Sequence, residues 1–272
     1  MSQKKILSVK FKIQRYDPEK DTKVHWQEFT VPTNPGMTVL EGLIYVKENQ
    51  DSTLAFRTSC RMGICGSCGM LINNYPRLAC HTQVKDLRSS QVAVRPLPNF
   101  PLIKDLVADF SSLFQKHKTV KPYIMRDDTS EMEEPTTEFF QRPQDLETFE
   151  QFSYCVKCGI CVGACPTTAR DKRFLGPQAL TQCYHYSADN RDDGENERVK
   201  IADTDHGVWR CHLAGACSEA CPKGVDPALA IQLLRQRLAL KSLGRGSKAE
   251  ASQTVPPATE IKSKVPYPEF NI

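Results

Sequence analysis

Three cysteines lie within the stretch SCRMGICGSCG, which runs from Ser59 to Gly69, and a fourth follows at Cys80. Cys60, Cys65 and Cys68 are separated by four residues and then by two. This spacing, with a fourth cysteine further on, is typical of chains that bind a [2Fe–2S] cluster. Two irons bridged by two sulfides need four thiolates, and the glycines of the stretch permit the sharp bends that wrap such a group. We expect the loop amides to point at the sulfurs and to tune the reduction potential.

A zinc site is the alternative interpretation of this loop, although zinc rarely uses a four-residue gap followed by a two-residue gap. Two arginines flank the first thiols, Arg57 and Arg61. They either offset the negative charge of a cluster or are ordinary surface residues, and the sequence leaves both interpretations open.

The second group of cysteines, CVKCGICVGACP, runs from Cys155 to Pro166 and has the bacterial pattern C-x2-C-x2-C-x3-C-P. In two-cluster ferredoxins the first three cysteines of such a run bind one cluster and the fourth binds the other. The partner run is CHLAGACSEACP, from Cys211 to Pro222, and its second position is Ala214 instead of cysteine.

Exchanging the fourth cysteines predicts two further clusters. Cys155, Cys158, Cys161 and Cys221 form a full set of ligands for a [4Fe–4S] cluster. Cys165, Cys211 and Cys217 leave one corner without a ligand, which predicts a [3Fe–4S] cluster; a [4Fe–4S] cluster with one open iron is the alternative. Cys183 has no partner in this scheme, and we expect it to be a small buried residue.

The elements that must position these thiols follow from local patterns. Alternating residues predict strands over 6–16, 24–32 and 91–97, and 69–80 predicts a hairpin that turns at Asn73-Asn74. Thr38 and Glu41 form a capping box that opens a helix through about Glu48. Helical spacing predicts one bridging helix over 102–117, and Asp226-Pro227 opens a last helix that Gly244 closes.

The expected fold class is α+β. Residues 1–105 form an N-terminal β-grasp, plant-type [2Fe–2S] ferredoxin domain, and 106–145 form a bridging helix and linker. Residues 146–243 form an all-α, two-cluster ferredoxin-like domain for the [4Fe–4S] and [3Fe–4S] clusters. Residues 244–272 are either an extended or disordered tail or a segment that lies along a partner.

Composition narrows the class of protein. The chain has 272 residues and a formal net charge of +4, which is too weak to predict a nucleic-acid partner. The chain contains no run of about 18 apolar residues, so the sequence predicts no membrane span. The N-terminus has neither a secretory signal nor a transit peptide, so we expect a reducing compartment, where twelve cysteines are ligands rather than disulfides.

The order of the three cysteine groups, together with NFPLIKDLV and KPYI, resembles the iron–sulfur subunit of succinate dehydrogenase and fumarate reductase, the complex II family. The resemblance runs from about Ile6 to Leu243 and is closer to bacterial fumarate reductases. It implies a subunit with no substrate-oxidising site of its own, which relays single electrons between the FAD of a flavoprotein subunit and a quinone held by one or more membrane anchor subunits, with or without haem b. It also implies peripheral attachment at the cytoplasmic face of a bacterial or archaeal plasma membrane.

The same resemblance places four residues near the quinone: Pro166, His212, Gln232 and Arg235. The segment after Pro166 reads TTARDKR, without the tryptophan pair common in ubiquinone-linked members, which favours menaquinone. The alternatives are that His212 is a surface or docking residue and that Gln232 and Arg235 lie on an exposed helix face.

Two other functions stay open. The chain could be the iron–sulfur subunit of a thiol-linked fumarate reductase or glycolate oxidase, although the Cys-Cys pairs usual there are absent. A zinc-binding interaction protein is the second alternative. A Rieske centre is not predicted, because the histidines lack its paired ligand spacing.

Overall fold

The computed structural model of the protein describes residues 7–243. These residues divide into two compact units. Of the described residues, those up to Ser112 and Val156–Ala164 form the first unit, and Leu113–Cys155 and those from Cys165 onward form the second. The sequence predicted a boundary in the cysteine-free stretch, but it did not predict that a piece of the second cysteine group packs with the first unit.

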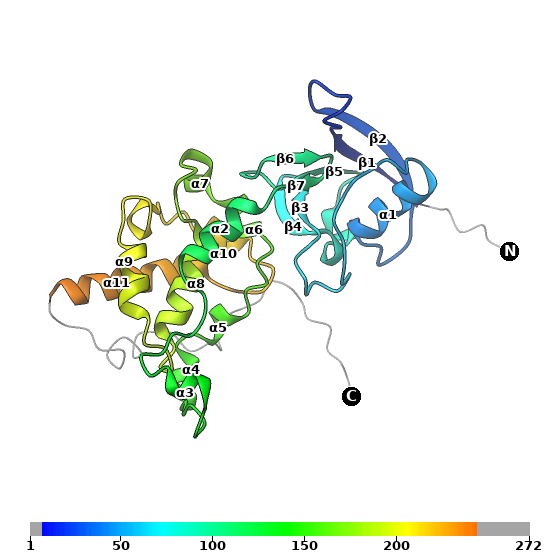
Figure 1. Cartoon of the computed structure of the whole chain (residues 1–272). Coiled ribbons are helices and arrows are strands. Elements are labelled where there is room, and N and C mark those ends of the chain that lie inside the picture. The colour runs from blue at the N-terminus through cyan, green and yellow to red at the C-terminus, as the bar shows by residue number, and fades with distance from the viewer. Residues whose placement is uncertain (1–6, 244–272) are drawn as a thin grey trace. The chain divides into compact units, whose positions relative to one another are not determined.

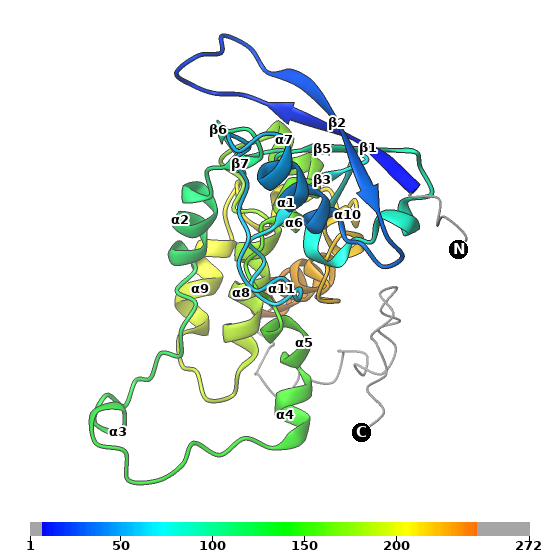
Figure 2. The same cartoon turned by 90° about the vertical axis from the view of Figure 1, so that its right-hand side faces the viewer.

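A five-stranded mixed sheet forms the centre of the first unit, with the order β2-β1-β5-β3-β4. Strand β1 pairs in parallel with β5, and the other pairs are antiparallel. The strands are β1 (Leu7–Arg15), β2 (His25–Thr33), β3 (Gly69–Ile72), β4 (Tyr75–Leu78) and β5 (Gln91–Arg95). The long β1–β2 ribbon is clearest in Figure 2. The predicted strands and the ferredoxin-type fold of this unit are confirmed.

Helix α1 (Val39–Asn49) covers the sheet at very close range. A Cβ atom on Gly42 would lie 2.2 Å from Cζ of the buried Phe11 on β1, so this glycine permits the contact. The predicted capping box is present, because the Thr38 hydroxyl accepts from the Glu41 amide and the Glu41 carboxylate accepts from the Thr38 amide. The hairpin turn is confirmed too, since Asn73 and Asn74 both have left-handed φ angles of 46° and 66°.

The predicted helix over 102–117 is wrong for its first half. The chain there forms a small hairpin of β6 (Leu102–Lys104) and β7 (Val107–Ala108), and α2 covers Ser111–Thr119. Asp105 turns the hairpin with a φ of 46°. Its buried carboxylate accepts hydrogen bonds from Arg15 Nε at 3.0 Å, the Tyr16 amide at 2.9 Å and the Ala55 amide at 2.8 Å. These hydrogen bonds to residues distant in the chain stabilise the turn, so the segment forms a hairpin although its residue pattern is helical.

Helices make up the second unit, as predicted (Figure 1). They are α2 from Leu113 onward, α3 (Ser130–Glu133), α4 (Pro143–Glu147), α5 (Glu150–Ser153), α7 (Pro166–Arg170), α8 (Pro177–Ala188), α9 (Glu195–Ala202), α10 (Ala216–Glu219) and α11 (Pro227–Ser242). Short 3-10 turns occur at Ala79–His81, Val84–Leu87 and Val208–Arg210. The Asp226 side chain caps α11 by accepting from the Leu229 amide, as expected, whereas Gly244 and the predicted tail over 244–272 lie outside the described residues.

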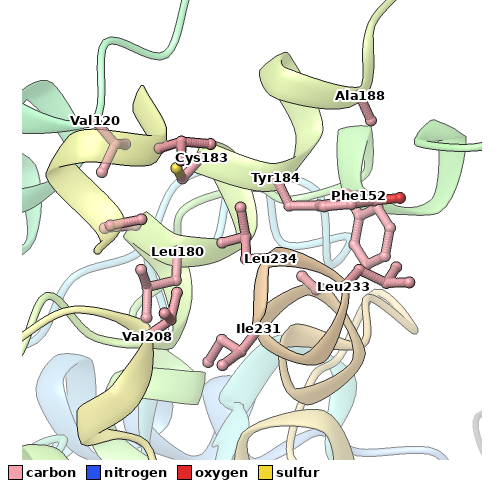
Figure 3. Packing of buried hydrophobic residues seen from close by; sticks show 14 of the residues in the cluster. Val120, Phe152, Leu180, Cys183, Tyr184, Ala188, Val208, Ile231, Leu233 and Leu234 are labelled. Carbon is pink, nitrogen blue, oxygen red and sulfur yellow. The ribbon is translucent and has the colours of Figure 1, made fainter. Parts of the chain in front are cut away.

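Helices α8 and α11 pack against each other and form the core of this unit. Figure 3 shows Leu180, Cys183 and Tyr184 of α8 facing Ile231 and Leu234 of α11. The core also holds a fully buried ion pair, in which Arg198 of α9 donates to both oxygens of Asp192. This apolar core borders most of the cysteines of the second unit and gives them a fixed support.

Candidate iron–sulfur centres

The first cysteine group lies on a loop that leads into β3, and Cys80 lies on the turn that follows β4. Gly63 and Gly66 have left-handed φ angles of 72° and 76°, which a residue with a side chain adopts only with strain. The β3–β4 hairpin brings Cys80 back beside the loop, because the Ala79 amide donates to the Cys68 carbonyl oxygen at 3.1 Å.

Backbone amides of this loop donate hydrogen bonds to the cysteine sulfurs. The Cys60 sulfur accepts from the amides of Met62, Ile64 and Cys65 at 3.5, 3.3 and 3.2 Å. The Cys80 sulfur accepts from the Gly63 amide at 3.3 Å, the Cys68 sulfur from the Cys80 amide at 3.4 Å and the Cys65 sulfur from the Cys60 amide at 3.5 Å. Amides aimed at sulfur stabilise thiolates and raise a cluster's potential, so this loop fits a [2Fe–2S] group.

The electrostatics of the loop favour thiolate at two positions. A hydrogen bond with Ser67 lowers the pKa of Cys65 to about 6. A hydrogen bond with Cys80 lowers the pKa of Cys68 to about 7, and the same bond raises the pKa of Cys80. Thiolate is the form that binds metal, so a lowered pKa favours metal binding at Cys65 and Cys68.

The two flanking arginines have different surroundings. The Arg57 guanidinium lies over the Phe110 ring, 5.6 Å from its centre, and Arg61 is exposed on the loop with a left-handed φ of 58°. Arg57 therefore has an aromatic partner within the first unit. Compensation of cluster charge by either arginine stays a prediction.

The cysteines of the second group belong partly to the first unit and partly to the second. Cys158 and Cys161 belong to the segment Val156–Ala164 of the first unit, which ends in α6 (Ile160–Ala164). The Asn99 side chain holds this segment by donating to the carbonyl oxygens of Val162 at 2.8 Å and Gly163 at 3.3 Å.

Cys155 and Cys221 belong to the second unit, and both pack against its apolar core. Burial raises the pKa of Cys221, and the charge of the neighbouring Cys155 raises it further. These two thiols pack against the same core although 66 positions separate them in the chain.

The third cysteine group comes together in the second unit. Burial raises the pKa of Cys217 to about 11, and the charges of Cys165 and Cys211 raise it as well. Burial also raises the pKa of Cys211, with a further contribution from Cys165. A bound cationic iron centre would offset the negative charge of these thiols in their thiolate form.

Each of these sulfurs sits at a defined place in the local structure. The Cys165 sulfur caps α7 by accepting from the Thr168 amide at 3.4 Å, and the Cys211 sulfur accepts from the Leu213 amide at 3.3 Å. Cys217 lies on α10, and Ala214 is exposed on the loop before it. The donor set of three thiols, with no side-chain ligand at position 214, fits a three-iron centre.

Comparison with known proteins identifies the class. Residues 10–115 match the family model of the 2Fe-2S iron-sulfur cluster binding domain, and residues 151–225 match that of the 4Fe-4S dicluster domain. The fumarate reductase iron-sulfur subunit of Mycobacterium tuberculosis (strain CDC 1551 / Oshkosh) is 45% identical over 231 residues, which cover 85% of this chain and 93% of that protein. The chain belongs to the family of fumarate reductase and succinate dehydrogenase iron–sulfur subunits.

Other members of the family support the same assignment. The fumarate reductase iron-sulfur subunit of Haemophilus influenzae is 42% identical, with 80% of this chain and 88% of the relative covered. The succinate dehydrogenase iron-sulfur subunit of Coxiella burnetii is 36% identical, with 84% and 96% covered. A chain of the Mycobacterium smegmatis Sdh1 complex matches with a TM-score of 0.79 at 25% identity, over 88% of this chain and 98% of that one.

Family membership confirms the predicted resemblance and the general function. The chain is an electron-transfer subunit of a fumarate reductase or succinate dehydrogenase complex, and its domains are of the 2Fe-2S and 4Fe-4S types. The thiol-linked complex and the zinc-binding interaction protein are not favoured. Among the described residues, no group of three His, Cys, Asp or Glu side chains is arranged to hold a single metal ion, and no helix is suited to crossing a membrane.

The four predicted quinone-proximal residues differ in exposure. Pro166, His212 and Gln232 are exposed, whereas Arg235 is half-buried. Arg235 donates to the carbonyl oxygens of Val208 and Cys211, and its guanidinium lies over the Trp209 ring. No local pattern in the sequence indicates this contact, because Arg235 and Cys211 are 24 positions apart in the chain.

Cys183 is fully buried on α8, as predicted, and its thiol donates to the Arg198 carbonyl oxygen at 3.6 Å. Burial raises the pKa of this thiol to about 12, so it stays protonated at neutral pH. A second feature that sequence reasoning missed is Asp171, whose carboxylate binds His206 and Arg210 at 2.9 Å each. This contact fixes the segment that leads into Cys211.

Proposed function

We propose that the chain relays single electrons between the FAD of a flavoprotein subunit and a quinone bound by a membrane anchor. Iron–sulfur clusters accept and donate one electron at a time, which links a two-electron flavin to a quinone. The observation that carries the proposal is the presence of three groups of cysteines in one chain that belongs to this family. The protein's own residues hold, orient and shield the clusters, and none is proposed as catalytic.

The proposed ligands of the [2Fe–2S] cluster are Cys60, Cys65, Cys68 and Cys80. This assignment is supported by the amide-to-sulfur hydrogen bonds of the loop and by the lowered pKa values of Cys65 and Cys68. Amides that donate to sulfur favour the reduced, more negative cluster, so these bonds help the site to accept an electron.

The proposed ligands of the [4Fe–4S] cluster are Cys155, Cys158, Cys161 and Cys221. The proposed ligands of the [3Fe–4S] cluster are Cys165, Cys211 and Cys217. The second assignment is supported by the charges of Cys165 and Cys211, which raise the pKa of Cys217, and by alanine at position 214. The first is supported by the effect of Cys155 on Cys221.

The quinone is proposed to be menaquinone, bound near Pro166, His212, Gln232 and Arg235. Exposure of the first three leaves them accessible to a partner, and the absence of a tryptophan pair after Pro166 favours menaquinone. Arg235 supports the segment from which His212 projects. The anchor subunit, with or without haem b, would hold the chain at the cytoplasmic face of a bacterial or archaeal plasma membrane.

Reduction of the purified complex tests this function. Succinate added anaerobically should reduce the [3Fe–4S] centre, and a menaquinone analogue should exchange electrons with it faster than a ubiquinone analogue does. Replacement of His212 by Ala should slow exchange with the quinone while leaving reduction by succinate unchanged. Equal rates with both quinone types would overturn the menaquinone assignment, and no reduction by succinate would overturn the relay itself.

A further inference from the structure

The loop of the first cysteine group approaches the backbone and Cβ of Cys158, in the second group, at Gly66. A Cβ atom on Gly66 would lie 2.7 Å from Cβ of Cys158, 2.9 Å from its Cα and 3.3 Å from its amide nitrogen. Real Cβ atoms do not approach other heavy atoms to 2.7 Å, so the space at Gly66 admits no side chain at all. Gly66 lies between Cys65 and Cys68.

Cys158 cannot easily move away from this contact. Its carbonyl oxygen would lie 3.2 Å from a Cβ atom on Gly69, so a second glycine of the loop meets the same residue. Farther along the segment, Asn99 holds the carbonyl oxygens of Val162 and Gly163. The atoms that face Gly66 are backbone and Cβ atoms rather than the end of a flexible side chain, so they give way only if the loop itself shifts.

We propose that Gly66 is a positioning residue, which holds the ligand loops of the [2Fe–2S] and [4Fe–4S] clusters at backbone contact. The inference rests on the ligand assignments of the proposed function. The route from the Cys65 sulfur to the Cys158 sulfur then crosses one non-bonded step, at the Gly66 Cα. With both clusters bound, one electron would pass between them, so that one would be oxidised as the other is reduced, and no bond would form or break.

A short separation matters because electron tunnelling slows steeply with distance. A methyl group at position 66 must push the Cys65–Cys68 loop and Cys158 apart, since neither side offers a side chain that can rotate away. The two clusters would each keep their ligands and yet lie farther apart. This consequence separates a positioning role from a role in assembling either cluster.

The loop provides a matched control for the test. Gly63 has nearly the same left-handed φ as Gly66, 72° against 76°, so alanine imposes a similar backbone strain at both positions. A Cβ atom on Gly63 would meet the ring of the exposed His81 at 3.4 Å, an ordinary contact. Alanine keeps the backbone amide at both positions, including the Gly63 amide that donates to the Cys80 sulfur at 3.3 Å. The iron content of Gly63→Ala checks that this bond survives, and the two variants then differ in the contact with Cys158.

The measurement is EPR power saturation of the reduced [2Fe–2S] signal in the purified complex, with iron and sulfide content determined in parallel. When the [4Fe–4S] cluster is also reduced, its spin should speed the relaxation of the first signal in the wild-type complex and in Gly63→Ala. In Gly66→Ala this enhancement should be weaker at unchanged iron content. Equal relaxation in the two variants would overturn the inference.

A second variant covers the case in which Gly66→Ala loses its cluster. Gly69→Ala imposes no left-handed strain and presses on the Cys158 carbonyl oxygen by a few tenths of an ångström. It should keep its iron and show a smaller weakening of the enhancement, and an unchanged enhancement would overturn the inference. Absence of either cluster signal from the wild-type complex would instead overturn the ligand assignments.

Discussion

The guanidinium group of Arg235 donates a hydrogen bond of 2.7 Å to the carbonyl oxygen of Cys211. The same group donates to the Val208 carbonyl oxygen, at 3.1 Å from Nε and at 2.7 Å from Nη2. Its face lies over the Trp209 ring, 5.5 Å from the ring centre. One side chain of α11 therefore fixes both ends of the short segment that presents the Cys211 thiol.

This contact predicts that Arg235→Gln weakens the third cluster site. Loss of charged hydrogen bonds to two carbonyl oxygens should lower the free energy of unfolding by about 1.5–3 kcal/mol. Arg235→Lys keeps the charge but lacks the planar fork, so we expect an intermediate effect. Thermal unfolding and the amplitude of the three-iron EPR signal measure the outcome without involving quinone. Wild-type stability and signal in both variants would contradict a supporting role.

Replacement of Ala214 by Cys tests the alignment of the third cysteine group. A thiolate at this position would supply the missing fourth ligand, so the variant should hold a four-iron cluster with a lower potential. EPR of the oxidised protein should show loss of the three-iron signal. Persistence of that signal at full iron content would mean that position 214 does not face the open corner.

The sequence predicted correctly those helix starts and turns that depend only on interactions between neighbouring residues. The Thr38–Glu41 capping box and the Asn73-Asn74 turn need only neighbouring residues, and both occur as predicted. The helix predicted over 102–117 failed because the deciding contact joins Asp105 to Arg15, 90 positions away. Spacing along the chain cannot reveal such a partner.

In the candidate site, too, local patterns are informative and contacts between distant segments are not predictable. Cysteine spacing predicts the ligands of each cluster, because cluster chemistry restricts the number and separation of ligands, and this assignment stays a prediction. It could not predict that Gly66 meets Cys158, or that Arg235 binds the Cys211 carbonyl oxygen. Both contacts depend on how separate segments pack, and the residues around Gly66 and Arg235 form no pattern that predicts either contact.

Cys183 is predicted to have no part in metal binding. The thiol is fully buried with a pKa of about 12, so Cys183→Ala should leave the iron content unchanged. The small cavity should cost roughly 1 kcal/mol of stability. Cys161→Ala serves as the comparison, because loss of a proposed ligand should reduce iron content. A fall in iron for Cys183→Ala at intact folding would make it a ligand.

Asp51 predicts a specific pH dependence of stability. Burial raises the pKa of this carboxyl, but hydrogen bonds from Thr53 and Arg15 outweigh it and lower the pKa to about 2. A lowered pKa stabilises the fold above the unfolded value of 3.8, and this contribution disappears as the pH falls toward 2. Asp51→Asn should therefore lower the melting temperature equally at pH 5 and pH 8. A difference that shrinks between these two pH values would contradict the assignment.

EPR of the anaerobically purified complex, first oxidised and then reduced in steps, tests the central claim most directly. The account predicts a three-iron signal in the oxidised sample and a [2Fe–2S] signal that appears on reduction. Replacement of Cys65 by Ala should remove the second signal and leave the first. An oxidised wild-type sample with no three-iron signal, and with four-iron behaviour at Cys165, Cys211 and Cys217, would contradict the proposed relay.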